Sequence, residues 1–284
     1  MRLAELVLAT VLLILFIVKL IKGQKYEEYT KQLKGDDYPL SELYTVGYAW
    51  NDSKLFSLRG RLKLTLIKQA RLLYDPNYAE FYAVTAWAQI MTFAHLFLCA
   101  GFILAGAMDF AVPAFAAVIF AAVISYYFFS AMGKKLEERR TACIIELPEV
   151  VSSMALLINS GMILREAWGK ISESKDGEIY TLMRNANADM NNGMSEIDAI
   201  HKFGVMSDTT EIKKFSSALV QSIEKNGREL SSTLVKQSSE MWNIKKQTML
   251  QKGEAAAAKL LAPTAMIFVG VLVIIIAAAM GMLL

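Results

Sequence analysis

The stretch that decides the fold is residues 84–106, VTAWAQIMTFAHLFLCAGFILAG, followed shortly by residues 110–132, FAVPAFAAVIFAAVISYYFFSAM. Neither stretch contains Lys, Arg, Asp or Glu. A helix of about 20 apolar residues is long enough to cross the ~30 Å hydrocarbon core of a bilayer. The two stretches therefore predict a transmembrane hairpin, with residues 107–109 as its turn.

Two further apolar windows flank this pair. Residues 260–284 carry no charged side chain, and residues 3–21 carry only Glu5 and Lys19. The alternative explanation of residues 3–21 is a cleaved signal peptide. The apolar run, however, ends in Lys19-Leu-Ile-Lys22, and no small-x-small cleavage site follows. We therefore expect a retained anchor and, in total, an all-α integral membrane protein with about four transmembrane helices.

The charges of the loops predict the orientation. Residues 22–81 hold ten Lys or Arg and residues 133–259 hold eighteen, whereas the hairpin turn holds none. Because positively charged loops stay in the cytoplasm, both long segments are expected there. The expected layout is a transmembrane anchor at 1–22, a cytoplasmic segment with a basic amphipathic helix at 23–83, a transmembrane hairpin at 84–132, a cytoplasmic helical bundle at 133–262 and a final transmembrane helix at 263–284.

The bundle segment is predicted to be helical from its periodicity. Its apolar residues recur at helical spacing, which indicates about six antiparallel helices. Gly161, Gly193, Gly204 and Gly227 are the expected helix corners, because glycine tolerates the left-handed conformation that ends helices. The sequences that follow Gly161, Gly193 and Gly227 are weakly similar, and either a repeated helical hairpin or a plain bundle explains them.

Several residues near these corners are candidates for either a structural role or partner contact. Glu146, Pro148 and Glu149 are expected at the start of the first bundle helix, where a proline and acidic side chains suit a helix N-terminus. Glu166 follows the Gly161 corner and is explained in the same way. The last bundle helix is expected to run on into the final membrane span, with Pro263 kinking it at the boundary.

A basic amphipathic helix is expected over residues 55–73. Its leucines recur on one face, and it carries Arg59, Arg61, Lys63, Lys68 and Arg71. Such a helix beside a membrane lies in the interface or packs on the bundle, and the sequence leaves both open.

The search for catalytic motifs excludes most enzyme classes. The chain has two histidines, too few for a histidine-based zinc site, and it contains no phosphate-binding loop, nucleophile elbow or dinucleotide fingerprint. We expect no catalytic residue, no metal site, no cofactor and no nucleic-acid partner. Gln89 and His95 are the intramembrane polar candidates. The simpler explanation of His95 is a neutral imidazole that makes one interhelical hydrogen bond, and the alternative is a transport role.

Several motifs resemble a known family. LPE at residues 147–149 and NSGMILREA at residues 159–167 resemble the type II secretion system F-domain family. NGREL at residues 226–230 and EAAAAKLLAP at residues 254–263 resemble its single-domain branch, the TadB/TadC-like platform proteins of tight-adherence (Flp) type IV pili. The resemblance covers residues 133–284 best.

This resemblance implies an inner-membrane platform protein for pilus assembly or type II-like secretion, and not an enzyme. Its cytoplasmic six-helix bundle would contact a secretion or pilus ATPase, and its membrane helices would guide pilin subunits from the lipid bilayer into the filament. It would work with a paired F-domain membrane protein, as a homo- or hetero-oligomer. The competing hypotheses are a small transporter or channel, supported by Gln89 and His95 alone, and a membrane-anchored enzyme.

Overall fold

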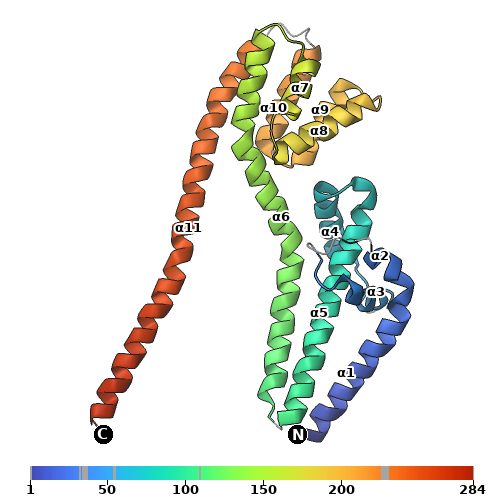
Figure 1. Ribbon diagram of the computed structural model, residues 1–284, viewed down its shortest axis with the longest axis vertical. Helices are drawn as coiled ribbons and strands as arrows, with labels where there is room; N and C mark the ends of the chain where they lie inside the picture. The colour runs from blue at the N-terminus through green and yellow to red at the C-terminus, as the bar shows by residue number, and fades with distance from the viewer. Residues whose placement is uncertain are drawn as a thin grey trace. The chain divides into compact units, whose positions relative to one another are not determined.

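The computed structural model describes residues 2–31, 33, 38–53, 56–108, 110–224 and 230–283, and these form helices without any strand (Figure 1). The chain divides into two compact units, Met1–Glu138 and Arg139–Leu284. Short 3₁₀ turns occur at Gln24–Tyr26, Ser41–Leu43 and Pro76–Tyr78. The α-helices are α1 (Arg2–Gly23), α2 (Glu27–Lys31), α3 (Tyr44–Asn51), α4 (Gly60–Leu73), α5 (Ala79–Met108), α6 (Val112–Asn159), α7 (Leu164–Ser172), α8 (Glu178–Asn191), α9 (Glu196–Ser207), α10 (Thr210–Glu224) and α11 (Leu230–Leu283).

Four helices of the described chain are long and apolar enough to cross a membrane, as judged by length and composition. They are α1, α5, α6 and α11, which carry the four apolar windows of the sequence. This confirms the predicted fold class, an all-α membrane protein with four candidate spans. Asp109, in the predicted hairpin turn, lies outside the described residues. The candidate spans run over Glu5–Lys31, Pro76–Met108, Val112–Asn159 and Ser232–Leu272.

Helices α5 and α6 pack closely along their apolar lengths. A Cβ added at Gly101 would overlap the Cβ of Ala117, so the glycine lets the two helices approach each other. Farther along, the rings of Phe93 and Phe128 stack with their centroids 4.9 Å apart. Small residues at helix contacts are typical of membrane proteins, where close backbone approach replaces the hydrophobic effect as a driving force.

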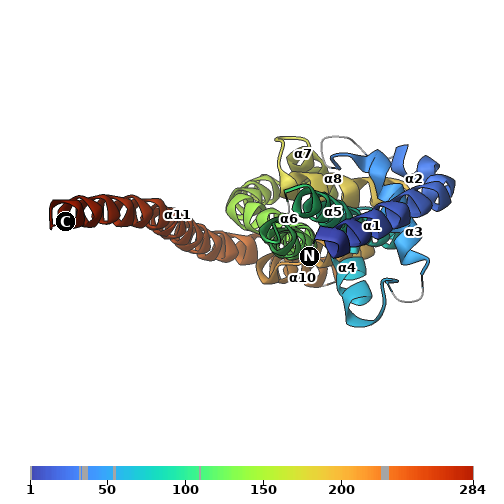
Figure 2. The same ribbon diagram turned by 90° about the horizontal axis from the view of Figure 1, so that it is seen from below.

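The short helix α3 is buried against α1 and α5, which run side by side in both views (Figures 1 and 2). A Cβ added at Gly47 would overlap the carbonyl oxygen of Ala88 on α5, and one added at Gly23 would overlap the carbonyl oxygen of Thr45. The amide of Gly47 also donates to Thr92 Oγ1 at 3.1 Å. Backbone therefore packs directly on backbone at both contacts of α3.

Helix α4 packs within the first unit. Leu66 and Ala70 are fully buried against α5 and α6, together with Met132. The opposite face of α4 is exposed. The basic amphipathic helix of the sequence therefore buries its apolar face on two of the candidate membrane helices.

The second unit is built around one apolar core. Among the described residues, six helices contribute buried side chains to it, namely α6 to α11, in agreement with the predicted bundle. Trp168 is fully buried, and its Nε1 donates to the carbonyl oxygen of Met183 at 3.1 Å. Its ring also meets Phe203 edge to face, with the centroids 4.9 Å apart. The core thus satisfies the one polar atom of its largest side chain.

The first bundle helix does not begin where the sequence suggested. Pro148 and Glu149 lie inside α6, which is continuous from Val112 to Asn159, so their predicted place in a first helical turn is wrong. A proline inside a helix removes one backbone hydrogen bond. Leu147 and Val150 on either side are fully buried in the core, and this packing keeps the segment helical.

Pro263 lies within α11, and the last bundle helix runs on into the final apolar segment as one helix from Leu230 to Leu283. Gly204 lies inside α9 and not at a corner, which corrects that prediction. A Cβ there would come within 2.7 Å of Ser216 Oγ, so this glycine serves the packing of α9 on α10. Helix α9 ends instead at Asp208, which is left-handed with φ 51°.

Replacing Gly47 with Ala tests the backbone contact of α3. We expect the added methyl group to force α3 away from α5 and to destabilise the protein by about 1–3 kcal/mol. Thermal unfolding in detergent, followed by circular dichroism, measures the effect. Gly169→Ala is the matched control, because nothing lies within 4 Å of its added Cβ and alanine favours a helix. Equal melting temperatures for the two variants would contradict the proposed close packing.

Candidate functional site

Gly161 ends α6 in a left-handed turn. Its φ is 91°, and its amide donates to the carbonyl oxygen of Ile158 at 3.0 Å. The next amide, that of Met162, donates to the carbonyl oxygen of Leu157 at 3.1 Å. This pair of hydrogen bonds is a Schellman motif, which satisfies the last carbonyl groups of a helix. Gly161 is therefore a fixed corner between α6 and α7.

Gly193 makes the same corner between α8 and α9. Its φ is 97°, its amide donates to Met190 at 3.2 Å, and the amide of Met194 donates to Asp189 at 3.0 Å. Ser195 then caps α9 by accepting a hydrogen bond from the amide of Asp198 at 3.1 Å. The similar sequences after the two glycines therefore correspond to the same local structure. Gly227, the last of the four predicted corners, lies outside the described residues.

The Gly161 and Gly193 corners are linked at one end of the bundle. Arg165, in the first turn of α7, donates to the carbonyl oxygen of Met190 and to Asn191 Oδ1, both at 3.5 Å. We call residues 159–166 and 191–196 the corner surface. Most of its side chains are exposed, including the acidic Glu166 in the first turn of α7 and the apolar Ile163, which is 62% exposed.

Glu149 and Pro148 lie away from the corner surface, in the middle of the bundle part of α6. Glu149 forms an ion pair with Lys175 in the α7–α8 loop. Glu146 was expected to serve the start of its own helix, but it lies inside α6 and contacts another helix. Glu146 Oε2 accepts a hydrogen bond from the amide of Ile179 at 2.9 Å, so a side chain of α6 caps the N-terminus of α8.

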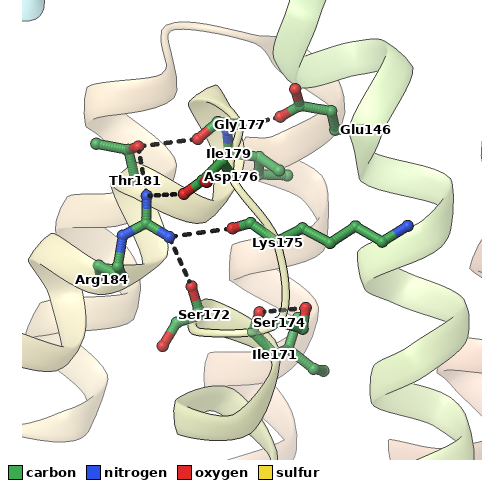
Figure 3. Close-up of polar contacts among 10 residues, drawn as sticks. All are labelled: Glu146, Ile171, Ser172, Ser174, Lys175, Asp176, Gly177, Ile179, Thr181 and Arg184. Carbon is green, nitrogen blue, oxygen red and sulfur yellow. Dashed lines mark hydrogen bonds and ion pairs between the residues drawn. The ribbon is translucent and has the colours of Figure 1, made fainter.

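The loop between α7 and α8 is braced from both sides (Figure 3). Arg184 on α8 donates to the carbonyl oxygens of Ser172 and Lys175, at 3.0 and 3.1 Å, and to Thr181 Oγ1 at 3.0 Å. On the α6 side, Glu146 leaves room for no side chain at Gly177, because an added Cβ would come within 2.6 Å of its carboxylate. These contacts fix the loop against α6 and α8.

The surroundings of this loop also affect Tyr180. Burial, together with the negative charges of Glu149 and Glu146, raises the pKa of Tyr180 to about 12. The phenol therefore stays protonated at physiological pH. It belongs to the core and is not a candidate acid or base.

His95 joins three helices of the first unit. Trp50 Nε1 on α3 donates to His95 Nδ1 at 3.0 Å, and His95 Nε2 donates to the carbonyl oxygen of Leu12 on α1, also at 3.0 Å. The two bonds fit the neutral tautomer that carries its proton on Nε2. His95 thus makes two interhelical hydrogen bonds where one was expected. Gln89, six residues before His95 on α5, is also buried.

No group of three metal-ligating side chains gathers among the described residues. The structure brings Gly161, Glu166 and Gly193 together at the corner surface. Pro148 and Glu149 lie beside the α7–α8 loop instead, and Pro263 lies in the apolar part of α11. The geometry offers exposed, fixed protein surface, which suits binding of another protein.

Arg184→Met tests the brace of the α7–α8 loop. The variant leaves two carbonyl groups without their donor, and we expect opening of the loop to become easier by about 1–3 kcal/mol. Amide hydrogen exchange of peptides covering residues 172–181 should become faster. Lys214→Met, at an exposed cation on α10, is the control and should leave that exchange unchanged. Unchanged exchange in both variants would count against the brace.

His95→Phe tests the link between α1, α3 and α5. The ring keeps most of its volume, but the Trp50 N–H loses its acceptor, so we expect a loss of about 1–3 kcal/mol in stability. The melting temperature in detergent reports it. His201→Phe, at the exposed histidine of α9, should change stability by no more than about 0.5 kcal/mol. A His95→Phe protein that melts like the wild type would rule out the structural role.

Comparison with known proteins finds a family model that matches most of the second unit. Residues 150–283 match the family model described as "Type II secretion system (T2SS), protein F". No curated protein and no solved structure matches the chain. Proteins of the F family are membrane platform proteins and not enzymes. The match supports the type II secretion F-domain family, and with the four apolar helices it indicates a multi-pass protein of the inner membrane.

Proposed function

We propose that this chain is an inner-membrane platform for assembly of a tight-adherence (Flp) type IV pilus, or for type II-like secretion. It couples a cytoplasmic ATPase to extraction of pilin subunits from the bilayer and to their polymerisation. It works with a paired F-domain protein of the same membrane. The motifs at residues 226–230 and 254–263, which resemble the single-domain branch, favour the tight-adherence pilus over the other secretion systems.

The observation that carries this proposal is the position of the family match. It begins in the bundle part of α6 and ends near the C-terminal end of α11. Both helices are also candidate membrane spans. A bundle whose first and last core helices continue as apolar helices is suited to link events at its surface with events in the bilayer.

The flanking charges support a cytoplasmic bundle. Lys19, Lys22 and Lys25 follow the apolar part of α1, and Lys134, Lys135, Arg139 and Arg140 follow that of α6. Positively charged residues at the ends of spans remain in the cytoplasm. The proposed layout therefore keeps the anchor at 1–22, the cytoplasmic segment at 23–83, the hairpin at 84–132, the bundle at 133–262 and the last span at 263–284.

The corner surface is the proposed ATPase contact. Its two Schellman corners hold their backbone in one conformation, so little entropy is lost when a partner binds. Ile163, two residues after Gly161, is more exposed than Met194, the other exposed large apolar side chain of this surface. Buried apolar anchors surrounded by polar side chains are common hot spots of protein interfaces.

Co-purification with the candidate secretion ATPase tests the function. The full-length protein, solubilised with its paired F-domain protein, is expected to capture the ATPase. Ile163→Arg should reduce capture at least about tenfold, because it places a charge in the contact. The matched control is Val205→Arg, at an exposed apolar residue near the other end of α9, and it should capture normally.

The outcomes separate two failures. Normal capture by Ile163→Arg would move the contact away from the corner surface but keep the platform function. Lack of capture by the wild-type pair would overturn the platform function and favour the transporter hypothesis.

A further inference from the structure

Helix α4 packs on α5 and α6 near the ends of their apolar segments. Its buried residues Leu66 and Ala70 belong to a cluster with Ala83 and Ala86 of α5 and Met132 of α6. Ala83 and Ala86 lie at the start of the apolar stretch 84–106 of α5, and Met132 is the last residue of the apolar stretch 110–132 of α6. A helix packed at this level lies beside the lipid head groups when α5 and α6 cross the bilayer.

The outward side of α4 carries a basic stripe, which we define as Arg61, Lys68 and Arg71. With Leu64, these residues are spaced by three, four and three positions, so they share one face of the helix. All four are exposed, and Leu64 is 70% exposed. This face lies opposite Leu66, so the helix presents cations to the outside while its apolar face is held by α5 and α6.

The stripe has no acidic side chain beside it on α4. No Asp or Glu occurs from Ser53 to Tyr74. Lys63, on another side of α4, pairs with Glu80 at 2.6 Å. In the part of the chain that the structure describes, no carboxylate forms an ion pair with any residue of the basic stripe.

We propose that the basic stripe of α4 binds the head groups of anionic phospholipids in the adjacent leaflet. Arg61 and Arg71 can each donate two parallel hydrogen bonds to a phosphate, and Lys68 adds a point charge between them. The exposed Leu64 lies among these cations, where the boundary between head groups and acyl chains would cover it. An acidic protein surface would match the charges, but it would not explain the place of α4 at the ends of two apolar helices.

This binding would fix the first unit in depth and rotation. Juxtamembrane cations attract anionic lipids, each by about fivefold in binding constant. The lipid contact depends on the membrane placement of α5 and α6 and not on the ATPase contact. Each of the two contacts can therefore be tested without the other.

The test places a probe at the centre of the stripe. The full-length Leu64→Cys variant carries a fluorophore on its new thiol, because Cys99 and Cys143 are buried. The protein is reconstituted in nanodiscs of phosphatidylcholine, with or without phosphatidylglycerol, and lipids with a nitroxide near the head group act as quenchers. The unsubstituted protein, treated with the same dye, gives the background.

We expect quenching that depends on phosphatidylglycerol and falls in high salt. Adding Arg61→Gln, Lys68→Gln and Arg71→Gln should reduce the phosphatidylglycerol-dependent part at least about fivefold. The matched control removes three exposed cations of the second unit by Lys170→Gln, Lys214→Gln and Lys246→Gln, and it should keep the quenching.

Two results would overturn the proposal. Equal quenching with and without phosphatidylglycerol would show that α4 lies near the lipid without recognising its charge. No quenching in either bilayer would show that the stripe faces away from the lipid, and an acidic protein would then be its partner. The salt titration on the Leu64→Cys protein gives the answer even where the triple variant does not fold.

Discussion

The rest of this structure depends on one requirement, that a backbone in the hydrocarbon core must satisfy its hydrogen bonds within itself. Helices α6 and α11 meet this requirement along their apolar segments. Each helix also continues past its apolar segment and supplies residues to the core of the bundle. Only α7 to α10 are confined to the bundle. The bundle is therefore a set of short helices folded against two long ones.

Each of the two units is stabilised internally by a different kind of interaction. In the first unit, glycines such as Gly47 let backbones touch, and His95 provides hydrogen bonds between three helices. In the second unit, an apolar core around Trp168 packs the helices together, and polar side chains fix the connections between them. Glu146 caps α8 and Arg184 holds the α7–α8 loop, so the exposed connections keep one conformation without a bound partner. At the proposed ATPase contact, which lies elsewhere on the bundle, the Schellman turns at Gly161 and Gly193 provide the corresponding preorganisation.

Much of this fold follows from the sequence, because charge-free windows and helical periodicity report membrane spans and core faces directly. The corners at Gly161 and Gly193 were also predictable, since both positions need a left-handed residue. Pro148 was misplaced because a proline signals a helix start only on average, and burial of Leu147 and Val150 outweighs its local cost. The roles of Glu146 and α3 could not be predicted, because each depends on contacts between residues far apart in the chain. Nothing in the local pattern of Tyr44–Asn51 announces a buried helix, since its glycine and tyrosines acquire their function only against α5.

The bundle begins on the same helix that ends the membrane hairpin. Amide hydrogen exchange of the reconstituted full-length protein tests it most directly, in peptides that cover residues 128–150 of α6. A continuous helix predicts slow exchange throughout this segment, with Pro148 contributing no amide signal and no fast-exchanging gap beside it. Rapid exchange near Gly133 or just before Pro148, with slow exchange on both sides, would show two separate helices and contradict the account.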